Sequence, residues 1–303
     1  MRNALILCLL LSGLNALASQ LSKPAEKCQA NAASKKKIIF LAGGCSHGFG
    51  EHEYRAACLL LARNLEKHFS GQVETVVYTD SWPTADDAFD NVAAIVMFLE
   101  GSTKHLTLPR LNIMDSLMKK GIGLACLHFA VHVPPGPAGE HFKNWIGGYY
   151  ETFWSVNPFW KPEFLPFPEH PILNGVKPFT IRDEWYYHMR FKDSGVTPIL
   201  SAIPPQSIMN LPGGHQSNEF VRQEYGQPQS LAWAIQREDG GRGFGFTGGH
   251  YHRNWAHDDY RKLVLNAIAW TANIEVPVNG VESPTPTTGQ LDANVDSKPC
   301  IVK

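Results

Sequence analysis

Histidines gather at three places in the sequence, and each group lies at or just after the end of a strand-like run. The three segments are GCSHGFGEHE at 44–53, GIGLACLHFAVH at 121–132 and GGHYH at 248–252. Neutral imidazole is a versatile metal ligand and also transfers protons near neutral pH. Because a parallel α/β sheet presents its ligands at the carboxyl ends of its strands, one folded site could gather all three segments.

Four of these histidines are the candidate metal ligands, namely His52, His128, His132 and His250. Two or three imidazoles with a carboxylate or an open position form the usual sites for divalent metal ions. Glu53 is the candidate carboxylate ligand or general base. The spacing of four between His128 and His132 places both rings on one face only if the chain turns helical there. The alternative is that several of these histidines cap loops and bind backbone groups.

An acidic and aromatic motif, DEWYY at 183–187, follows a short strand-like run. Glu184 or Tyr186 is the candidate general acid, and Asp183 is a candidate for binding a substrate hydroxyl. The alternative is that the two carboxylates pair with arginines or loop amides and hold a lid in place. His47 and His252 are further candidate substrate contacts.

The segment 133–178 is rich in proline, glycine and aromatic residues, and we expect it to form a wall over the site. Aromatic faces can stack on sugar rings, and Trp154 is the candidate for such a contact. The alternative is that these aromatic side chains pin the long insertion to the core.

Around these motifs, strand-like runs alternate with amphipathic helical segments. The predicted strands are 38–41, 73–78, 93–99 and 122–127, followed by short strands at 179–181 and 197–202 and a late pair at 231–236 and 243–247; the predicted helices are 53–69, 107–120 and 258–272. This alternation predicts an α/β fold, a three-layer doubly wound sheet in a single domain with a long aromatic insertion.

The chain has 303 residues, of which 44% are apolar and 18% charged, and this composition is ordinary for a globular domain. The formal net charge of -1 gives no electrostatic reason to expect nucleic acid or an acidic membrane surface as a partner. A small-molecule carbohydrate substrate is the expected partner, and a homo-oligomer is possible.

The N-terminus has the pattern of an export signal. Arg2 supplies the positive end, 4–14 is the apolar segment, and the small-x-small site ends at residue 18. We expect a signal peptide at 1–18, a flexible leader at 19–36, the ordered domain at 37–274 and an extended tail at 275–303. The mature protein would be periplasmic or secreted, without a membrane anchor. Cys28 and Cys300, both in terminal tails, could form a disulfide there.

Five segments, in order, resemble the ThuA-like family, which is named for a trehalose-utilisation protein. They are SHGFGEHEY, LACLHFAVH, EHPILNGVKPFTIRDEWYY, FTGGHYHRNW and YRKLVLNAIAWTA, and the resemblance spans about 37–272. It implies a flavodoxin-like sheet similar to class I glutamine amidotransferases, a role around oxidised or unusual sugars, and zinc near the motif histidines.

Cys126 falls near the position of the amidotransferase nucleophile. Ala125 and His128 replace the small glycines beside it, however, so the tight turn and oxyanion hole of those enzymes are not expected.

We therefore expect an exported, metal-assisted enzyme that acts on a carbohydrate by lyase or hydrolase chemistry, on a glycoside or a keto sugar. A ring ketone acidifies the adjacent C–H, which a histidine or glutamate could deprotonate. Two alternatives stay open: a non-catalytic carbohydrate-binding protein and a cysteine-dependent amidohydrolase acting through Cys126.

Overall fold

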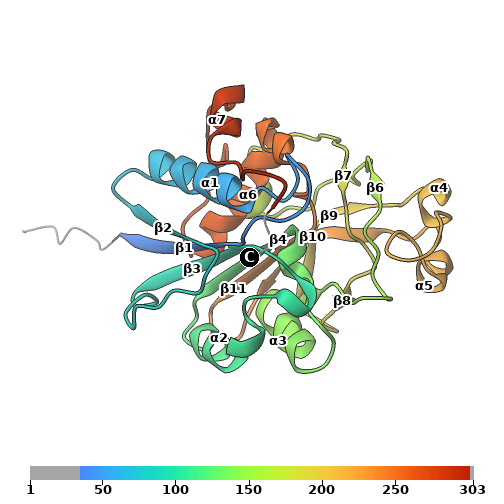
Figure 1. Cartoon of the computed structure of the whole chain (residues 1–303), viewed down its shortest axis with the longest axis horizontal. Helices are drawn as coiled ribbons and strands as arrows, with labels where there is room; N and C mark the ends of the chain where they lie inside the picture. Colours follow the sequence, from blue (N-terminus) through green and yellow to red (C-terminus); the bar gives the residue numbers. More distant parts are fainter. Residues whose placement is uncertain (1–34, 301–303) are drawn as a thin grey trace, which may run out of the picture. The chain divides into compact units, whose positions relative to one another are not determined.

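A seven-stranded sheet, in the order β2-β1-β3-β4-β11-β10-β9, forms the centre of the fold (Figure 1). The computed structural model describes residues 35–300, so the expected export signal, nearly all of the leader and Cys28 lie outside the described residues. The strands are β1 (Lys36–Ala42), β2 (Val73–Thr79), β3 (Val92–Phe98), β4 (Gly123–Leu127), β9 (Val196–Ala202), β10 (Gln229–Gln236) and β11 (Arg242–Phe246). From β2 to β11 all neighbours are parallel, whereas β10 is antiparallel to both β11 and β9.

Helices cover both faces of the sheet, which confirms the predicted flavodoxin-like α/β fold. Figure 1 shows α1 (Tyr54–His68) and α6 (Asp258–Thr271) on one face and α2 (Leu111–Met118) and α3 (Pro137–Ile146) on the other. Strand β4 serves both layers, because Ala125 and Leu127 pack into the core beneath α1 and α6 while Leu124 and Cys126 pack into the opposite core. A strand that is buried on both faces reads as a continuous apolar run, as β4 does.

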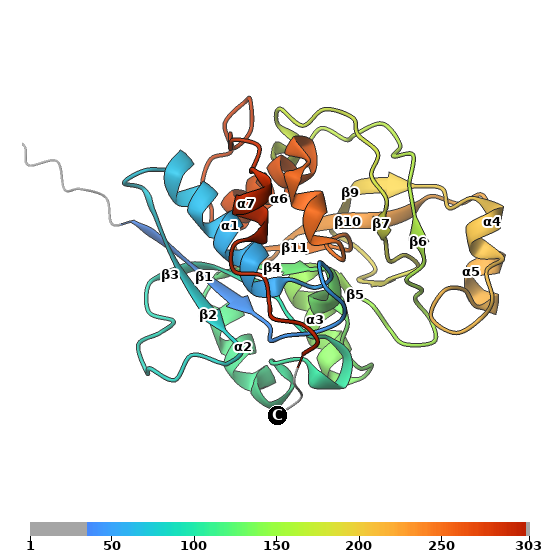
Figure 2. The same ribbon diagram turned by 45° about the horizontal axis from the view of Figure 1, so that its top comes forward.

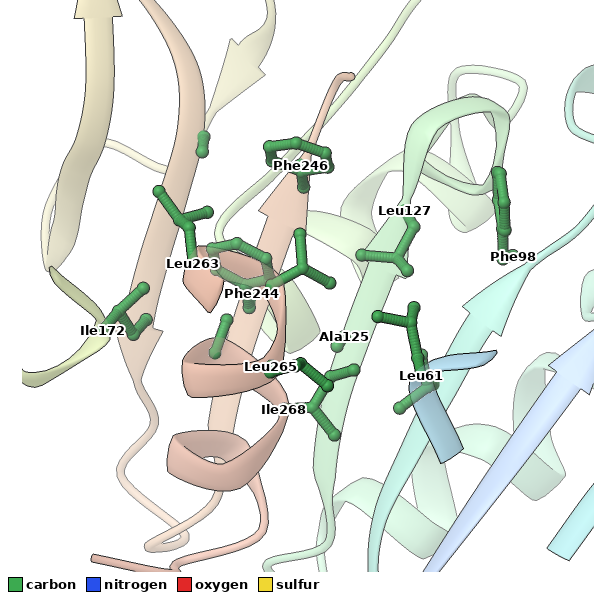
Figure 3. Close-up of a cluster of buried hydrophobic side chains, with 14 of the residues drawn as sticks. Leu61, Phe98, Ala125, Leu127, Ile172, Phe244, Phe246, Leu263, Leu265 and Ile268 are labelled. Atoms are coloured by element: carbon green, nitrogen blue, oxygen red, sulfur yellow. The ribbon is translucent and has the colours of Figure 1, made fainter. Parts of the chain in front are cut away.

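The core beneath α6 is built from interlocking aliphatic and aromatic side chains. Leu265 and Ile268 of α6 lie near Ala125 of β4, and Leu263 lies beside Phe244 of β11 (Figure 3). Each is completely enclosed, and burial of one such side chain stabilises the fold by about 1.5–3 kcal/mol. This packing holds in place β4 and β11, the strands that His128 and His250 follow.

The insertion between β4 and β9 is more structured than a loop. It contains α3 and two short antiparallel strand pairs, β5 (Gly148–Tyr149) with β8 (Arg190–Phe191) and β6 (Phe159–Trp160) with β7 (Asp183–Glu184). The strand expected at 179–181 is absent, and β7 begins just after it. The remaining elements are α4 (Gln206–Met209), α5 (Glu219–Gln223), α7 (Thr288–Asp292) and the 3-10 turns η1 (Ser102–Lys104), η2 (Leu108–Arg110), η3 (His128–Val131), η4 (Pro171–Leu173) and η5 (His252–Ala256).

The segment that follows α6 was expected to be an extended tail, but it folds back onto the domain. Helix α7 packs against α1 and η5, and the chain then crosses toward the loop after β1 (Figure 2). Cys300 forms its disulfide with Cys45 of that loop, so the predicted pairing with Cys28 is wrong. In residues 35–300, none of the helices combines the length and apolarity that crossing a membrane requires.

Candidate functional site

Four ligand atoms from four segments converge at the carboxyl edge of the parallel strands. Nε2 of His52 lies 3.1 Å from Nε2 of His128 and 3.0 Å from Nδ1 of His250. A carboxylate oxygen of Glu184, Oε2, lies 3.3 Å from the His128 nitrogen and 3.1 Å from the His250 nitrogen. All four side chains are buried, and their ligand atoms lie within 4.8 Å of one another.

The position of His128 follows from the end of β4. The strand ends at Leu127, and His128 takes a left-handed φ of 52° that turns the chain into η3. Its Nδ1 lies 2.7 Å from the carbonyl oxygen of Thr247. Because a carbonyl only accepts hydrogen bonds, Nδ1 carries the hydrogen and the lone pair of Nε2 faces the cluster.

A hydrogen-bond chain behind His52 has the same effect. Nδ1 of His52 lies 2.6 Å from the hydroxyl of Tyr54, and that hydroxyl donates to the carboxylate of Glu100 across 3.4 Å. When the tyrosine hydrogen points to Glu100, the hydroxyl accepts from Nδ1 and leaves the lone pair of Nε2 free. Outer partners of this kind commonly fix the tautomer of a metal-bound histidine.

His250 and Glu184 form the charged side of the cluster. Burial opposes a charge on His250, but its hydrogen bond to Glu184 outweighs this effect and raises the pKa of His250 above its ordinary value. Burial likewise opposes a charge on Glu184, yet the neighbouring rings of His128 and His250 lower its pKa to about 2. Nε2 of His250 is buried without a hydrogen-bond partner among the described residues, and it lies 3.5 Å from the carboxylate of Glu51.

These four side chains fit a tetrahedral metal site. Zinc–ligand bonds of about 2.0–2.1 Å put neighbouring donor atoms about 3.3–3.4 Å apart, and four of the distances in the cluster are 3.0–3.3 Å. Three imidazoles and one carboxylate form a donor set that zinc accepts. The buried atom of His250 and the carboxylate of Glu51 add a further outer pair of the kind that orients a ligand.

His132 was predicted to be a metal ligand, but it lies outside the cluster. Glu184 takes the fourth position in the cluster instead. Nε2 of His132 lies 2.8 Å from the hydroxyl of Thr152. The 3-10 turn η3 separates the rings of His128 and His132, so the helical geometry that would align them is not formed. Burial lowers the pKa of His132 to about 3 and keeps its ring neutral.

Glu53, the predicted base or ligand, is also not one of the four. Its carboxylate is fully enclosed, and it accepts hydrogen bonds from the backbone N–H groups of Gly50 and Asp296. Lys298 forms an ion pair with it across 3.3 Å. With both oxygens engaged in this way, Glu53 binds the loop to the tail and is not placed to receive a substrate proton.

Asp183 and His252 likewise form hydrogen bonds within the protein. The Asp183 carboxylate accepts from the N–H of Gly249 across 2.9 Å and from the hydroxyl of Tyr260 across 2.7 Å, so it shapes the turn that carries His250. Nε2 of His252 lies 2.9 Å from the carbonyl oxygen of Leu291 in α7. Both side chains are buried and already hydrogen-bonded within the protein, so neither is available to bind a sugar.

Tyr186 lies directly beside the cluster. Its hydroxyl is 3.1 Å from Nε2 of His128, and the two rings pack with their centroids 4.6 Å apart. Burial, together with the nearby charge of Glu184, raises the pKa of Tyr186 well above its ordinary value. The phenol therefore keeps its proton near neutral pH and is available as a donor.

An open hollow of about 450 Å³ lies beside His47 and is also lined by Glu100, Lys104 and the disulfide cysteines. The exposed His47 ring stacks on His52, with 3.6 Å between centroids. Burial is the largest effect on the pKa of His47 and lowers it, so this ring is neutral near pH 7. His47 is thus the predicted substrate contact with both an open side and a neighbour in the cluster.

The other predicted groups lie away from the cluster. The Trp154 ring is stacked by His188 and lies under the guanidinium of Arg190 at 3.5 Å, so it holds two parts of the insertion together. Cys126 is completely buried in β4, and burial raises the pKa of its thiol. A buried thiol of this kind is a packing group and not an activated nucleophile.

Sequence reasoning missed Tyr54, Glu51 and Glu100 as outer partners of the cluster. Glu51 and Tyr54 flank His52 in the first histidine motif, and Glu100 follows β3 at the same edge of the sheet. Their positions after parallel strands are the feature of the sequence that could have indicated a place near the site. Nothing in the linear spacing distinguishes them from Glu53.

The comparisons with known proteins agree with this architecture. The family model for ThuA, described as trehalose utilisation, matches residues 42–271. Among solved structures, a putative ThuA-like protein from Bacteroides uniformis is similar, with a TM-score of 0.53, 16% identity and coverage of 82% of this chain and 95% of that one.

A second structure, of a putative ThuA-like protein from Parabacteroides merdae, has a TM-score of 0.51 and 14% identity, and covers 84% of this chain and 94% of that one. At these identities the two structures support the fold alone. Among proteins of curated function, none matches the sequence significantly. Since the family model covers most of the chain, including all three histidine motifs, the chain belongs to the ThuA family.

Proposed function

We propose that the chain is an exported, metal-dependent enzyme that acts on a carbohydrate by lyase or hydrolase chemistry, with a glycoside or a keto sugar as its substrate. The observation that carries this proposal is the convergence of His52, His128, His250 and Glu184, whose ligand atoms lie within 4.8 Å of one another. The family description supports a carbohydrate-related role.

The donor set favours zinc as the ion, held by the three imidazoles and Glu184. When bound, such an ion would supply Lewis-acid polarisation to a substrate oxygen that joins these four ligands as a fifth donor, an expansion that zinc accepts. The outer partners Thr247, Tyr54 and Glu51 support this role, because each one faces the ring nitrogen that points away from the centre. The protein thus holds the rings in the orientation that ligation needs before any ion arrives.

Two side chains are placed for proton transfer. His47 is neutral, exposed to the hollow and stacked on His52, so it takes the role of base that the sequence suggested for Glu53. Tyr186, protonated and beside His128, remains the candidate acid for a departing sugar oxygen. Glu184 is a ligand in this arrangement and not the acid.

Export is supported by the disulfide between Cys45 and Cys300, because such bonds persist in oxidising compartments. The pattern at residues 1–18 supports the same location. A periplasmic or secreted protein meets sugars outside the cytoplasm, which agrees with the proposed substrate class.

The test is a screen of glycosides and keto-glycosides with zinc-loaded and chelator-treated protein. We expect turnover that chelation abolishes, that zinc restores and that His128→Ala lacks. His47→Asn should lower turnover by about 10²–10⁴-fold and keep its metal, whereas His215→Asn, at an exposed position, should behave as wild type. Turnover that is indifferent to chelation would contradict the metal role. Saturable sugar binding without turnover would identify a binding protein instead.

A further inference from the structure

We propose that the C-terminal strap, residues 293–300, is a positioning element for the metal site. It holds the site loop, residues 43–53, in the conformation in which His52 faces His128 and His250. This inference rests on the metal site of the proposed function, but the strap's effect on the loop can be measured without a metal. The family match ends at residue 271, so the strap lies beyond the matched segment.

Lys298 is the principal contact between the strap and the loop. Its ammonium donates to the carbonyl oxygens of Ser46 at 2.6 Å and Gly48 at 2.7 Å, and also to that of Glu51. The side chain is only 3% exposed. An ammonium has three hydrogens to donate, and backbone carbonyls of the site loop receive them. The loop is therefore wrapped around a buried cation supplied by the tail.

The same cation faces Glu53, whose carboxylate is fully buried. The ion pair spans 3.3 Å, and the N–H of Asp296 donates to the second carboxylate oxygen across 2.8 Å. Lys298 thus grips the residue before His52 through a backbone carbonyl and the residue after it through a side chain. Removing one partner of a buried ion pair leaves an uncompensated charge, which strongly destabilises the local structure.

The site loop needs such support because its backbone is strained. His47 and His52 both have left-handed φ values, 58° and 46°, as does Gly50 at 75°. Residues other than glycine adopt this region at a penalty, and they keep it only where the surroundings enforce it. For His52, the enforcing contacts are those of Lys298 on either side. The disulfide from Cys300 to Cys45, with Cα atoms 5.5 Å apart, ties the start of the loop.

The test compares Lys298→Met and the double variant Cys45→Ser/Cys300→Ser with Lys262→Met as a matched control. Lys262 also donates to two backbone carbonyls, those of Gly175 and Asn279, but away from the site loop. The two readouts are zinc affinity by chelator competition and amide hydrogen exchange of residues 43–53 in the metal-free protein.

We expect both strap variants to raise the Kd for zinc at least tenfold and to speed exchange in the site loop at least tenfold. Lys262→Met should stay within twofold of wild type on both readouts. Zinc affinity and loop exchange within twofold of wild type in Lys298→Met would overturn the proposal.

If Lys298→Met does not fold, the folded wild type is treated with a thiol reductant and its exchange is followed at 43–53. Faster exchange confined to the loop and the strap supports the proposal, whereas unchanged exchange after complete reduction contradicts it. A wild type that binds no zinc at all contradicts the proposed function, and the exchange readout then decides the strap separately.

Discussion

Nδ1 of His128 donates to the carbonyl oxygen of Thr247 across 2.7 Å, a contact made by the first residue after β4 with the first residue after β11. The parallel register pairs Leu127 with Phe246, so the two following residues lie side by side. The sheet itself therefore selects the tautomer of His128. The orientation of this ligand therefore depends on the register of β4 and β11.

Tyr54→Phe should weaken zinc binding while the fold persists. The substitution removes the hydroxyl that links His52 to Glu100, so the ring loses the partner that fixes its tautomer. Loss of such an outer partner typically lowers metal affinity about 10–100-fold. The matched control is Tyr187→Phe, because the Tyr187 hydroxyl is buried without a hydrogen-bond partner among the described residues. Equal zinc affinity in the two variants would argue against the His52 chain.

Zinc affinity should rise with pH through the neutral range. Burial opposes the charge on His250 and Glu184 favours it, and the net effect raises the pKa of His250 above 6.5. A histidine must lose its proton before it binds a metal ion, so affinity increases until His250 is deprotonated and then levels off. Glu51→Gln removes one of the charges that raise this pKa and should shift the curve to lower pH. Competition titrations between pH 5.5 and 8 in both proteins measure this, and a flat profile would contradict the assignment of His250.

Stability of the metal-free protein should fall as the pH drops below 6.5, in part through His132. Its pKa is about 3 in the folded state, against an ordinary value of 6.5, because burial opposes the charged form. The unfolded chain then binds a proton that the folded chain refuses, which lowers the free energy of unfolding by about 1.4 kcal/mol per pH unit. The protein therefore has its full stability from this residue above pH 6.5, and it loses that stability progressively as the pH falls from 6.5 toward 3. His132→Asn should flatten the dependence of Tm on pH, whereas His215→Asn at an exposed position should not.

The free thiols of the described region, Cys58 and Cys126, should resist alkylation in the folded protein. Both are completely buried, and burial raises the pKa of each thiol, so little reactive thiolate forms. Peptide mapping after iodoacetamide treatment should find both unmodified until a denaturant is added, and Cys126→Ser should keep its activity. Rapid inactivation with label on Cys126 would restore the amidohydrolase alternative.

Much of the fold and part of the site could be predicted from the sequence, for a physical reason. Apolar runs that alternate with amphipathic helices specify a parallel sheet, and parallel strands release their next residues at a common edge. His52, His128 and His250 each follow one of these strands or its loop, which is why they meet.

Long-range contacts determine the remainder of the site. The choice of Glu184 over His132 depends on the 3-10 turn after β4 and on the pairing of β6 with β7 inside the insertion. The ion pair of Glu53 and the disulfide of Cys300 both depend on where the C-terminal tail packs, because each joins residues some 250 positions apart in the sequence. The local sequence pattern does not predict such contacts.

The central claim is that His52, His128, His250 and Glu184 hold one divalent metal ion, and elemental analysis of the purified protein tests it most directly. We expect nearly one zinc per chain in the wild type after zinc supplementation and almost none in folded His128→Ala or His250→Ala. His132→Ala, which removes a histidine outside the cluster, should keep its metal. A folded, zinc-supplemented wild type without bound metal, or full metal content in His128→Ala and His250→Ala, would contradict the account.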